Sequence, residues 1–564
     1  EQIPLTANGK IDKRALPDFE QQHQTQGYTQ AADQTEKELV KIWEDILETS
    51  PIGVHDDFFE LGGHSLLAIR LISAIRKTFK TETPISDVFD YPTIAKLKQR
   101  IATQTDVEVL PKIEKQTKPK HIPLSYSQER LWFIDRLEGS LQYHIPSVLQ
   151  LEGNLSVEGL EKSIKKIVER HEVLRSTIQY DNTDTWQELL PWEGWQLEQY
   201  QQDQIDKNFI QNFINKPFDL SKDYMFRAAL VKQSPNQYQL ITVMHHIASD
   251  GWSNGIIVRE LSELYRAHIQ RRTHDLPKLQ IQYSDYAIWQ RNYLTKEKLE
   301  QKLAYWKQKL SNTTPLELPT DYPRPALQST KGAVAQFKID KTQTEALNQL
   351  SKQQGTTLFM TMLAAFKVLL YRYTGQTDIT VGTPTAGRQQ KEVEDLIGFF
   401  INTLALRTEL NEEAGFTDNL KKVKDTAMEA FANQDVPFEK IVEQVVTERD
   451  LSRSPLFQVM FVFQNTPEVP KMEFADIKLS PEQLGRASSR FEFTLSITET
   501  PDGLKCITHH CTDLFSEATI QRLMRHFEIL LGSIVQKPNS SINSLPIMDD
   551  AEVNTVLNTF GTSD

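Results

Sequence analysis

The residue types best suited to chemistry gather in residues 244–253, where His245 and His246 precede Asp250 and Gly251. An imidazole has an unperturbed pKa near neutrality, so it can accept or donate a proton at physiological pH. A histidine at the end of a strand is therefore a candidate general base. The competing interpretation is a structural histidine pair. The Asp-Gly turn that follows favours the chemical one.

The elements around this pair should give the two histidines different roles. Residues 239–246 alternate in a way typical of a buried strand, and side chains alternate between the two faces of a strand. His245 and His246 are therefore expected to point in opposite directions. Only one of them can face a given cavity.

Ser65 is a second candidate, because it follows the sequence Gly62-Gly63-His64. Two glycines permit a sharp turn, and Ser65 is then expected at the N-cap of a helix. A phosphate attached there would face free backbone N–H groups and the positive end of the helix dipole. The alternative is a serine that only caps the helix.

Apolar residues recur at helical spacing in the segments on both sides of Ser65, whereas the rest of the chain mixes patterns typical of helices and of strands. More than 400 residues exceed one usual core, so that part should form two lobes. The expected helices are 35–47, 65–79, 85–89, 93–101, 157–171 and 357–373, and the expected strands are 239–246, 379–382, 402–406, 456–463 and a strand through 506–511.

Composition excludes several classes. The chain has 564 residues and a net charge of −13, which argues against a general nucleic-acid binder. We expect no membrane span, because Lys367 and Arg372 interrupt the best apolar stretch. Two cysteines fit a reducing, cytoplasmic location without disulfides. The cluster at 506–511 should not bind a metal, because its residues alternate faces of a strand.

The pattern HHxxxDG at 245–251 resembles the active-site motif of the condensation domains of nonribosomal peptide synthetases. Further segments resemble condensation motifs in the expected order. They are LSYSQERLW at 124–132, RHEVLR at 170–175, YSDYAIW at 283–289, IGFFINT at 397–403, NQDVPFE at 433–439 and RDLSRSPLF at 449–457.

Residues 33–103, with DFFELGGHSL at 57–66, resemble a peptidyl carrier domain, in which the serine matching Ser65 holds 4′-phosphopantetheine. PLTANGKIDKR at 4–14 resembles the last motif of an adenylation domain, and Lys10 is expected to do no chemistry in this chain. LPIMDD at 545–550 resembles the linker into another adenylation domain.

These resemblances imply a division into an adenylation tail and linker (1–32), the carrier domain (33–103), a linker (104–120), two condensation lobes (121–295 and 296–545) and a final linker (546–564). The implied fold is multi-domain: an all-α four-helix carrier, then an α/β condensation domain. Its two lobes, each similar to chloramphenicol acetyltransferase, meet in a V with the histidine motif near the centre of a tunnel.

The implied activity is amide formation between a donor thioester on a carrier and the amine of an acceptor on a downstream carrier. The candidate catalytic residues are His246, His245, Asp250 and Gly251. His246 would receive or position the amine proton, or stabilise developing charge. His245 is expected to be structural. Asp250 should hold the turn through a buried ion pair with Arg388.

Gly251 is expected to permit a close backbone approach or a positive φ. The implied partners are a phosphopantetheinyl transferase, an upstream adenylation domain, downstream adenylation and carrier domains, and aminoacyl or peptidyl thioesters, without nucleic acid or membrane. Epimerisation, ester formation and a non-catalytic recruiting platform remain as alternatives. The preference for an L or D donor is left open.

Overall fold

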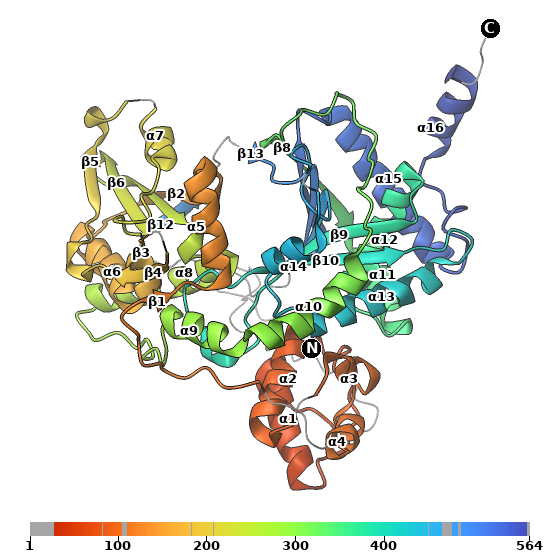
Figure 1. The fold of residues 1–564 in the computed structure, drawn as a ribbon, viewed down its shortest axis with the longest axis horizontal. Helices are drawn as coiled ribbons and strands as arrows, with labels where there is room; N and C mark the ends of the chain where they lie inside the picture. The colour runs from red at the N-terminus through yellow and green to blue at the C-terminus, as the bar shows by residue number, and fades with distance from the viewer. Residues whose placement is uncertain are drawn as a thin grey trace, which may run out of the picture.

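The computed structural model describes residues 28–81, 83–103, 110–181, 183–206, 208–448, 450–464, 477–482 and 487–560. The predictions for Lys10 and the rest of the N-terminal tail lie outside these residues. A small helical unit sits beneath two mixed lobes that spread apart as a V (Figure 1). None of the described helices is long and apolar enough to cross a membrane.

The helical unit is built from four helices around one aromatic core. Asp33 caps the first helix by accepting from the backbone N–H of Glu36, and Thr93 caps the last in the same way. Trp43 and Phe58 are completely buried and meet edge to face with ring centroids 5.1 Å apart. The helices are α1 (Gln34–Leu47), α2 (Ser65–Phe79), α3 (Ile85–Asp90) and α4 (Ile94–Ala102).

The first lobe carries a five-stranded sheet in the order β12-β2-β7-β6-β5 and a three-stranded sheet in the order β1-β4-β3. Its strands are β1 (Ile122–Pro123), β2 (His144–Glu152), β3 (Ser176–Tyr180), β4 (Thr185–Leu189), β5 (Glu198–Gln201), β6 (Phe226–Ser234) and β7 (Gln237–His245). Its helices are α5 (Tyr126–Glu138), α6 (Val157–Arg170), α7 (Phe209–Asn215), α8 (Gly251–Ile269) and α9 (Tyr283–Tyr293). Short 3₁₀ turns are η1 (Leu141–Tyr143), η2 (Glu172–Arg175), η3 (Trp192–Gly194), η4 (Gln202–Gln204) and η5 (His246–Ala248).

The second lobe carries a seven-stranded sheet in the order β10-β9-β11-β14-β15-β8-β13. Its strands are β8 (Lys331–Asp340), β9 (Asp378–Thr385), β10 (Asn402–Glu409), β11 (Val459–Gln464), β13 (Ala487–Ser488), β14 (Phe493–Thr500) and β15 (Gly503–Cys511). Its helices are α10 (Lys296–Leu310), α11 (Lys341–Gln353), α12 (Leu358–Thr374), α13 (Phe416–Ala432), α14 (Phe438–Val445), α15 (Glu517–Gln536) and α16 (Asp550–Thr555), with the turn η6 (Lys391–Val393) and a π-helical turn η7 (Val556–Phe560).

Helix α12 forms the centre of this lobe and ends at Gly375, which has a φ of 70° and caps the helix in the left-handed conformation. The helix begins one residue after and ends one residue after the predicted range 357–373. Lys367 lies inside this apolar helix, fully buried, and its Nζ donates to the carbonyl of Leu406 (2.7 Å) and to Oγ1 of Thr408 (2.8 Å). These contacts satisfy the N–H donors of a side chain that water cannot reach.

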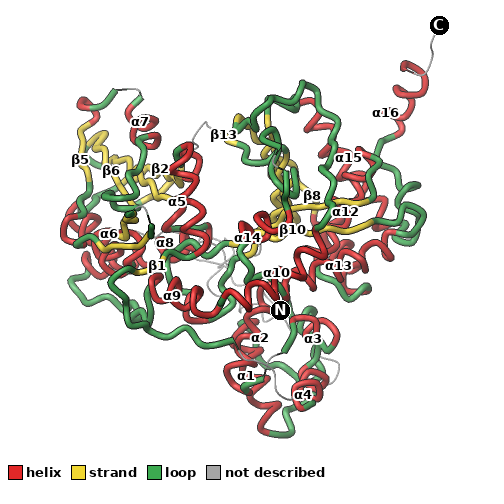
Figure 2. Tube along the Cα trace, viewed as in Figure 1, coloured by secondary structure: helices red, strands yellow, loops and turns green. Residues whose placement is uncertain are grey.

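More than one segment crosses between the lobes. Residues 393–400 follow β9 of the second lobe in the chain, but Val393, Ile397 and Phe400 are buried in the core of the first lobe. Strand β12 (Lys478–Pro481) follows β11 of the second lobe in the chain but pairs antiparallel with β2 in the sheet of the first lobe. Just after it, Glu482 accepts from Nε2 of Gln239 (2.6 Å) and of Gln150 (3.1 Å). Helices α9 and α10 make a further connection, below the opening of the V (Figure 2).

Candidate active site

The histidine pair lies where β7 ends and a short turn leads into α8. His245 is the last residue of β7, and His246 is the first residue of η5. The expectation that the strand reaches His246 is wrong by one residue. The cause is local: Nδ1 of His245 accepts from the backbone N–H of Ile247 (3.1 Å) and so caps the turn.

Both ring nitrogens of His245 are occupied. Because Nδ1 accepts from Ile247, Nε2 carries the hydrogen and donates to Oγ of Ser140 (2.8 Å). Ser140 in turn donates to Asp135. Burial is the main cause that lowers the pKa of His245, to about 3. This geometry fixes the neutral ring and supports the structural role expected for His245.

His246 is held by two aromatic rings from different lobes. The ring of Tyr143 meets it edge to face with centroids 6.4 Å apart, and the ring of Phe399 does so at 4.9 Å. Nδ1 of His246 is buried and has no hydrogen-bonding partner among the described residues. Burial lowers the pKa of His246 to about 4, and the nearby charge of Arg490 acts in the same direction. The imidazole is thus neutral at neutral pH and has a lone pair available.

Asp250 is fully buried and organises the turn after the histidines. Its Oδ1 accepts from the backbone N–H (3.0 Å) and Oγ (2.8 Å) of Ser253, which caps α8. Its Oδ2 accepts from the backbone N–H of Phe400 (3.1 Å). The guanidinium of Arg388, also fully buried, lies 3.1 Å from Oδ1. The predicted ion pair between Asp250 and Arg388 is confirmed.

Gly251 does not behave as expected. It is the first residue of α8 and is not among the glycines with positive φ. A Cβ built on Gly251 meets no described atom within 4 Å. The expectation of a positive φ is therefore wrong, whereas a close backbone approach at the tunnel, beside which Gly251 leaves open space, stays a prediction.

The carrier motif forms a sharp turn at the start of α2. Gly62 has a φ of 98°, and a Cβ on Gly63 would lie 2.3 Å from the ring of Phe58, so glycine is required at both positions. Ser65 is the first helical residue, and His64 is the N-cap, one position earlier than expected. His64 makes no side-chain capping bond, which leaves first-turn N–H groups available to a phosphate. The turn therefore fits an attached phosphopantetheine.

An ion pair that the sequence analysis did not anticipate joins the helical unit to the second lobe. Arg70 of α2 donates from Nε to Oε1 of Glu394 (2.9 Å) and from a terminal nitrogen to Oε2 (3.3 Å). The carbonyl of Glu394 accepts from Nε1 of Trp252 (2.9 Å), directly after the histidine motif. An isolated arginine and glutamate so far apart in the chain carry no sequence signal of pairing.

The Cys506–Cys511 cluster lies on β15, as the alternation predicts. Both cysteines are buried and unbonded to each other. Among the described residues no group of three or more potential ligands could hold a metal ion. The absence of a metal remains a prediction.

The family comparisons agree with this geometry. Residues 118–557 match the model of the condensation domain, and residues 37–101 match the model of the phosphopantetheine attachment site. One polypeptide of the linear gramicidin synthase of Brevibacillus parabrevis is 44% identical over 98% of this chain, and gramicidin S synthase 2 of Aneurinibacillus migulanus is 37% identical over 100%. The chain spans only 7% and 13% of the lengths of these relatives.

Solved structures share the arrangement of the two lobes. The X-domain from teicoplanin biosynthesis superposes with a TM-score of 0.70 at 27% identity, covering 78% of this chain and 100% of that one. A four-domain nonribosomal peptide synthetase bound to AMP and glycine gives a TM-score of 0.68 at 22% identity, covering 79% of this chain and 35% of that one. The expected fold, a helical carrier followed by a two-lobed α/β domain, is confirmed.

Proposed function

This chain belongs to the condensation-domain family and carries a phosphopantetheine attachment domain ahead of the condensation domain, and from that premise we propose that it forms amide bonds in nonribosomal peptide synthesis. The donor acyl group is held as a thioester on Ser65, and the acceptor amine arrives on a downstream carrier. The observation that carries the proposal is the neutral His246 held between Tyr143 and Phe399.

The phosphopantetheine arm, when bound to Ser65, supplies the thiol on which the donor is carried. The residues of the chain then position the acceptor amine and remove a proton from it. His246 accepts a proton from the acceptor amine as its nitrogen attacks the donor carbonyl. The C–N bond forms, the C–S bond breaks, and the thiol leaves with the proton that His246 took from the amine, which returns His246 to its neutral form. Asp250 and Arg388 hold the turn that orients His246, without touching the reacting atoms.

The contact between Arg70 and Glu394 supports the carrier of this chain as the donor carrier. Arg70 lies on the same helix that begins with Ser65, and Glu394 belongs to the turn that is bonded to Trp252. The remaining partners are a phosphopantetheinyl transferase that loads Ser65, an upstream adenylation domain, and downstream adenylation and carrier domains. A cytoplasmic location fits the predicted reducing environment and forms part of the same proposal.

A second function, a platform that recruits another enzyme, is favoured by one observation. The X-domain that superposes on 78% of this chain has also been solved in a complex with OxyB. The two functions differ in chemistry: a platform binds a partner protein without transferring the acyl group. The presence of His246 in an apolar, proton-accepting setting favours condensation.

The test loads Ser65 with an aminoacyl pantetheine and adds a downstream carrier that bears an amino acid. Intact-protein mass spectrometry should detect a dipeptide on the downstream carrier and no transfer in His246→Ala. Ser65→Ala should accept no pantetheine, and its loading in spite of the substitution would refute the attachment site. L, D and glycyl donors are compared, because donor configuration is unknown. Efficient loading of all three donors without transfer would refute condensation.

A further inference from the structure

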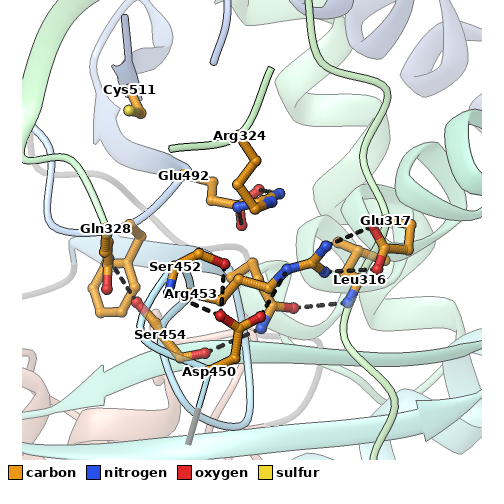
Figure 3. A network of polar contacts seen from close by, with 12 residues as sticks. Leu316, Glu317, Arg324, Gln328, Asp450, Ser452, Arg453, Ser454, Glu492 and Cys511 are labelled. Atoms are coloured by element: carbon orange, nitrogen blue, oxygen red, sulfur yellow. Dashed lines mark hydrogen bonds and ion pairs between the residues drawn. The ribbon is translucent and has the colours of Figure 1, made fainter. Parts of the chain in front are cut away.

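A network of ion pairs in the second lobe holds residues 489–492, the bend that leads into β14 (Figure 3). Arg324 donates to both carboxylate oxygens of Glu492, at 2.7 and 3.1 Å. Arg453 donates to both oxygens of Glu317, at 2.7 and 2.9 Å. Each of these two guanidinium groups is thus neutralised by a bidentate carboxylate partner.

The same network fixes the backbone of Arg490. Nε2 of Gln328 donates both to the carbonyl of Arg490 (2.6 Å) and to Oγ of Ser454 (2.9 Å). One residue earlier, the backbone N–H of Ser489 donates to the carbonyl of Thr330 (3.0 Å). The main chain at Arg490 is therefore anchored to the second lobe on both sides.

The side chain of Arg490 leaves this network and reaches the first lobe. A terminal nitrogen donates to the carbonyl of Gln142 (2.7 Å), and the guanidinium carbon lies 4.3 Å from the centre of the Tyr143 ring. Among the described residues Arg490 forms no ion pair with a carboxylate, unlike Arg324 and Arg453. Within the described part of the chain, the exposed Arg490 therefore brings a positive charge to the first lobe without a carboxylate partner.

Tyr143 brings this charge next to the candidate base. The ring that Arg490 covers is the ring that meets His246 edge to face. The ionisable groups around His246 are Arg490 from the second lobe, Tyr143 from η1, the neighbouring His245, and Asp250 at the start of α8. Arg130 of α5 also faces Tyr143 and Arg490, but it is paired with Glu439 at 2.7 Å. The negative charge of Asp250 is balanced by Arg388. Among the described residues, no carboxylate pairs with Arg490 to balance its positive charge.

We propose that Arg490 is a positioning residue of the condensation site, whose side chain crosses from the second lobe onto the ring of Tyr143 and places a positive charge beside His246. This charge adds to burial, which is the larger cause, in disfavouring the protonated imidazole. The inference rests on the proposed function, because it assigns a role within that reaction. A positive charge at this place also disfavours the ammonium form of the acceptor and favours the negative charge that develops on the donor carbonyl oxygen.

Three variants of the full chain test the assignment. Arg490→Met removes the charge, Arg490→Lys keeps it, and Arg453→Met is the matched control, because Arg453 belongs to the same network but faces Glu317. The protonation of His246 is followed between pH 3 and 8, a range that includes its pKa of about 4, by NMR of ¹³C-labelled histidine, with His246→Gln for assignment. The single-turnover rate of dipeptide formation is measured over the same range.

In Arg490→Met the titration midpoint of His246 should rise by about one pH unit, a tenfold change in the ratio of protonated to neutral imidazole. The acid limb of the rate profile should move with it, whereas Arg490→Lys should retain most of the native midpoint and Arg453→Met all of it. An unchanged midpoint in Arg490→Met, or an equal shift in Arg453→Met, would overturn the assignment. If the wild-type chain forms no dipeptide, the proposed function fails, whereas the NMR titration still decides the role of Arg490.

Discussion

Replacing Asp250 by Asn should destabilise the condensation domain as well as slow it. The two carboxylate oxygens have different tasks: Oδ1 accepts from Ser253 and Arg388, and Oδ2 accepts from the backbone N–H of Phe400. An asparagine amide has only one oxygen. If that oxygen stays with Ser253 and Arg388, the amide NH₂ faces the N–H of Phe400, so that two donors oppose each other in a site without water.

The magnitude follows from the burial of the pair. Both Asp250 and Arg388 have side chains with 0% exposure, so the substitution leaves a buried guanidinium without its counter-charge. Breaking a buried pair in this way costs about 3–5 kcal/mol. At roughly 2 °C per kcal/mol for a unit the size of one lobe, the thermal transition should fall by about 6–10 °C.

Calorimetry of the full chain, with dipeptide formation measured on the same samples, provides the assay. Asp395→Asn is the matched control, because Asp395 lies in the chain between Arg388 and Phe400, the two partners of Asp250, and pairs with Arg259 at 2.7 Å, but that pair is about half exposed. The control should lose less than about 1 kcal/mol. An Asp250→Asn chain that melts like the wild type and yet makes no dipeptide would refute the structural role and indicate direct catalysis.

Two further predictions follow from ionic contacts elsewhere. Arg70→Glu should slow transfer from the attached carrier about fivefold to tenfold, and adding Glu394→Arg should restore it; a double variant as slow as the single one would contradict the docking contact. Lys367→Met tests a buried amine. Burial places the pKa of Lys367 well below its usual value, so above that lowered pKa the unfolded chain binds a proton that the native state lacks. The native state therefore gains stability as the pH rises toward 10. The melting temperature of the wild type relative to Lys367→Met should therefore increase over pH 7–10, and a constant difference would refute the reasoning.

Elements and contacts that depend on a local residue pattern could be predicted from the sequence. Helix α2 has the predicted bounds, Ser65–Phe79, because its apolar spacing and the preceding glycines define them. Helix α6 ends at Arg170, one residue earlier than predicted. The pairing of Asp250 with Arg388 was predictable because a buried carboxylate in a turn needs a cation, and a turn after a strand offered one.

Contacts that depend on how distant segments meet could not be placed. Nothing in the sequence near Arg490 indicates that its side chain crosses to Tyr143. The same holds for the ion pair of Arg70 and Glu394, because each partner is a single residue on a separate domain. The position of His246 was also mispredicted. The strand ends one residue early because Nδ1 of His245 accepts from the backbone N–H of Ile247, and the hydrophobic alternation gives no sign of such a bond.

The crossing of β12 has a consequence for the order in which the chain is made. Strand β2 ends at Glu152, but the strand that covers its outer edge begins at Lys478. At about 5–20 residues per second, a ribosome needs on the order of tens of seconds to cover that interval. During that time the nascent first lobe exposes an unpaired sheet edge, which is a template for pairing with another chain. Synthesis of the first lobe alone should therefore yield aggregates, and adding a peptide of the β12 sequence should suppress them.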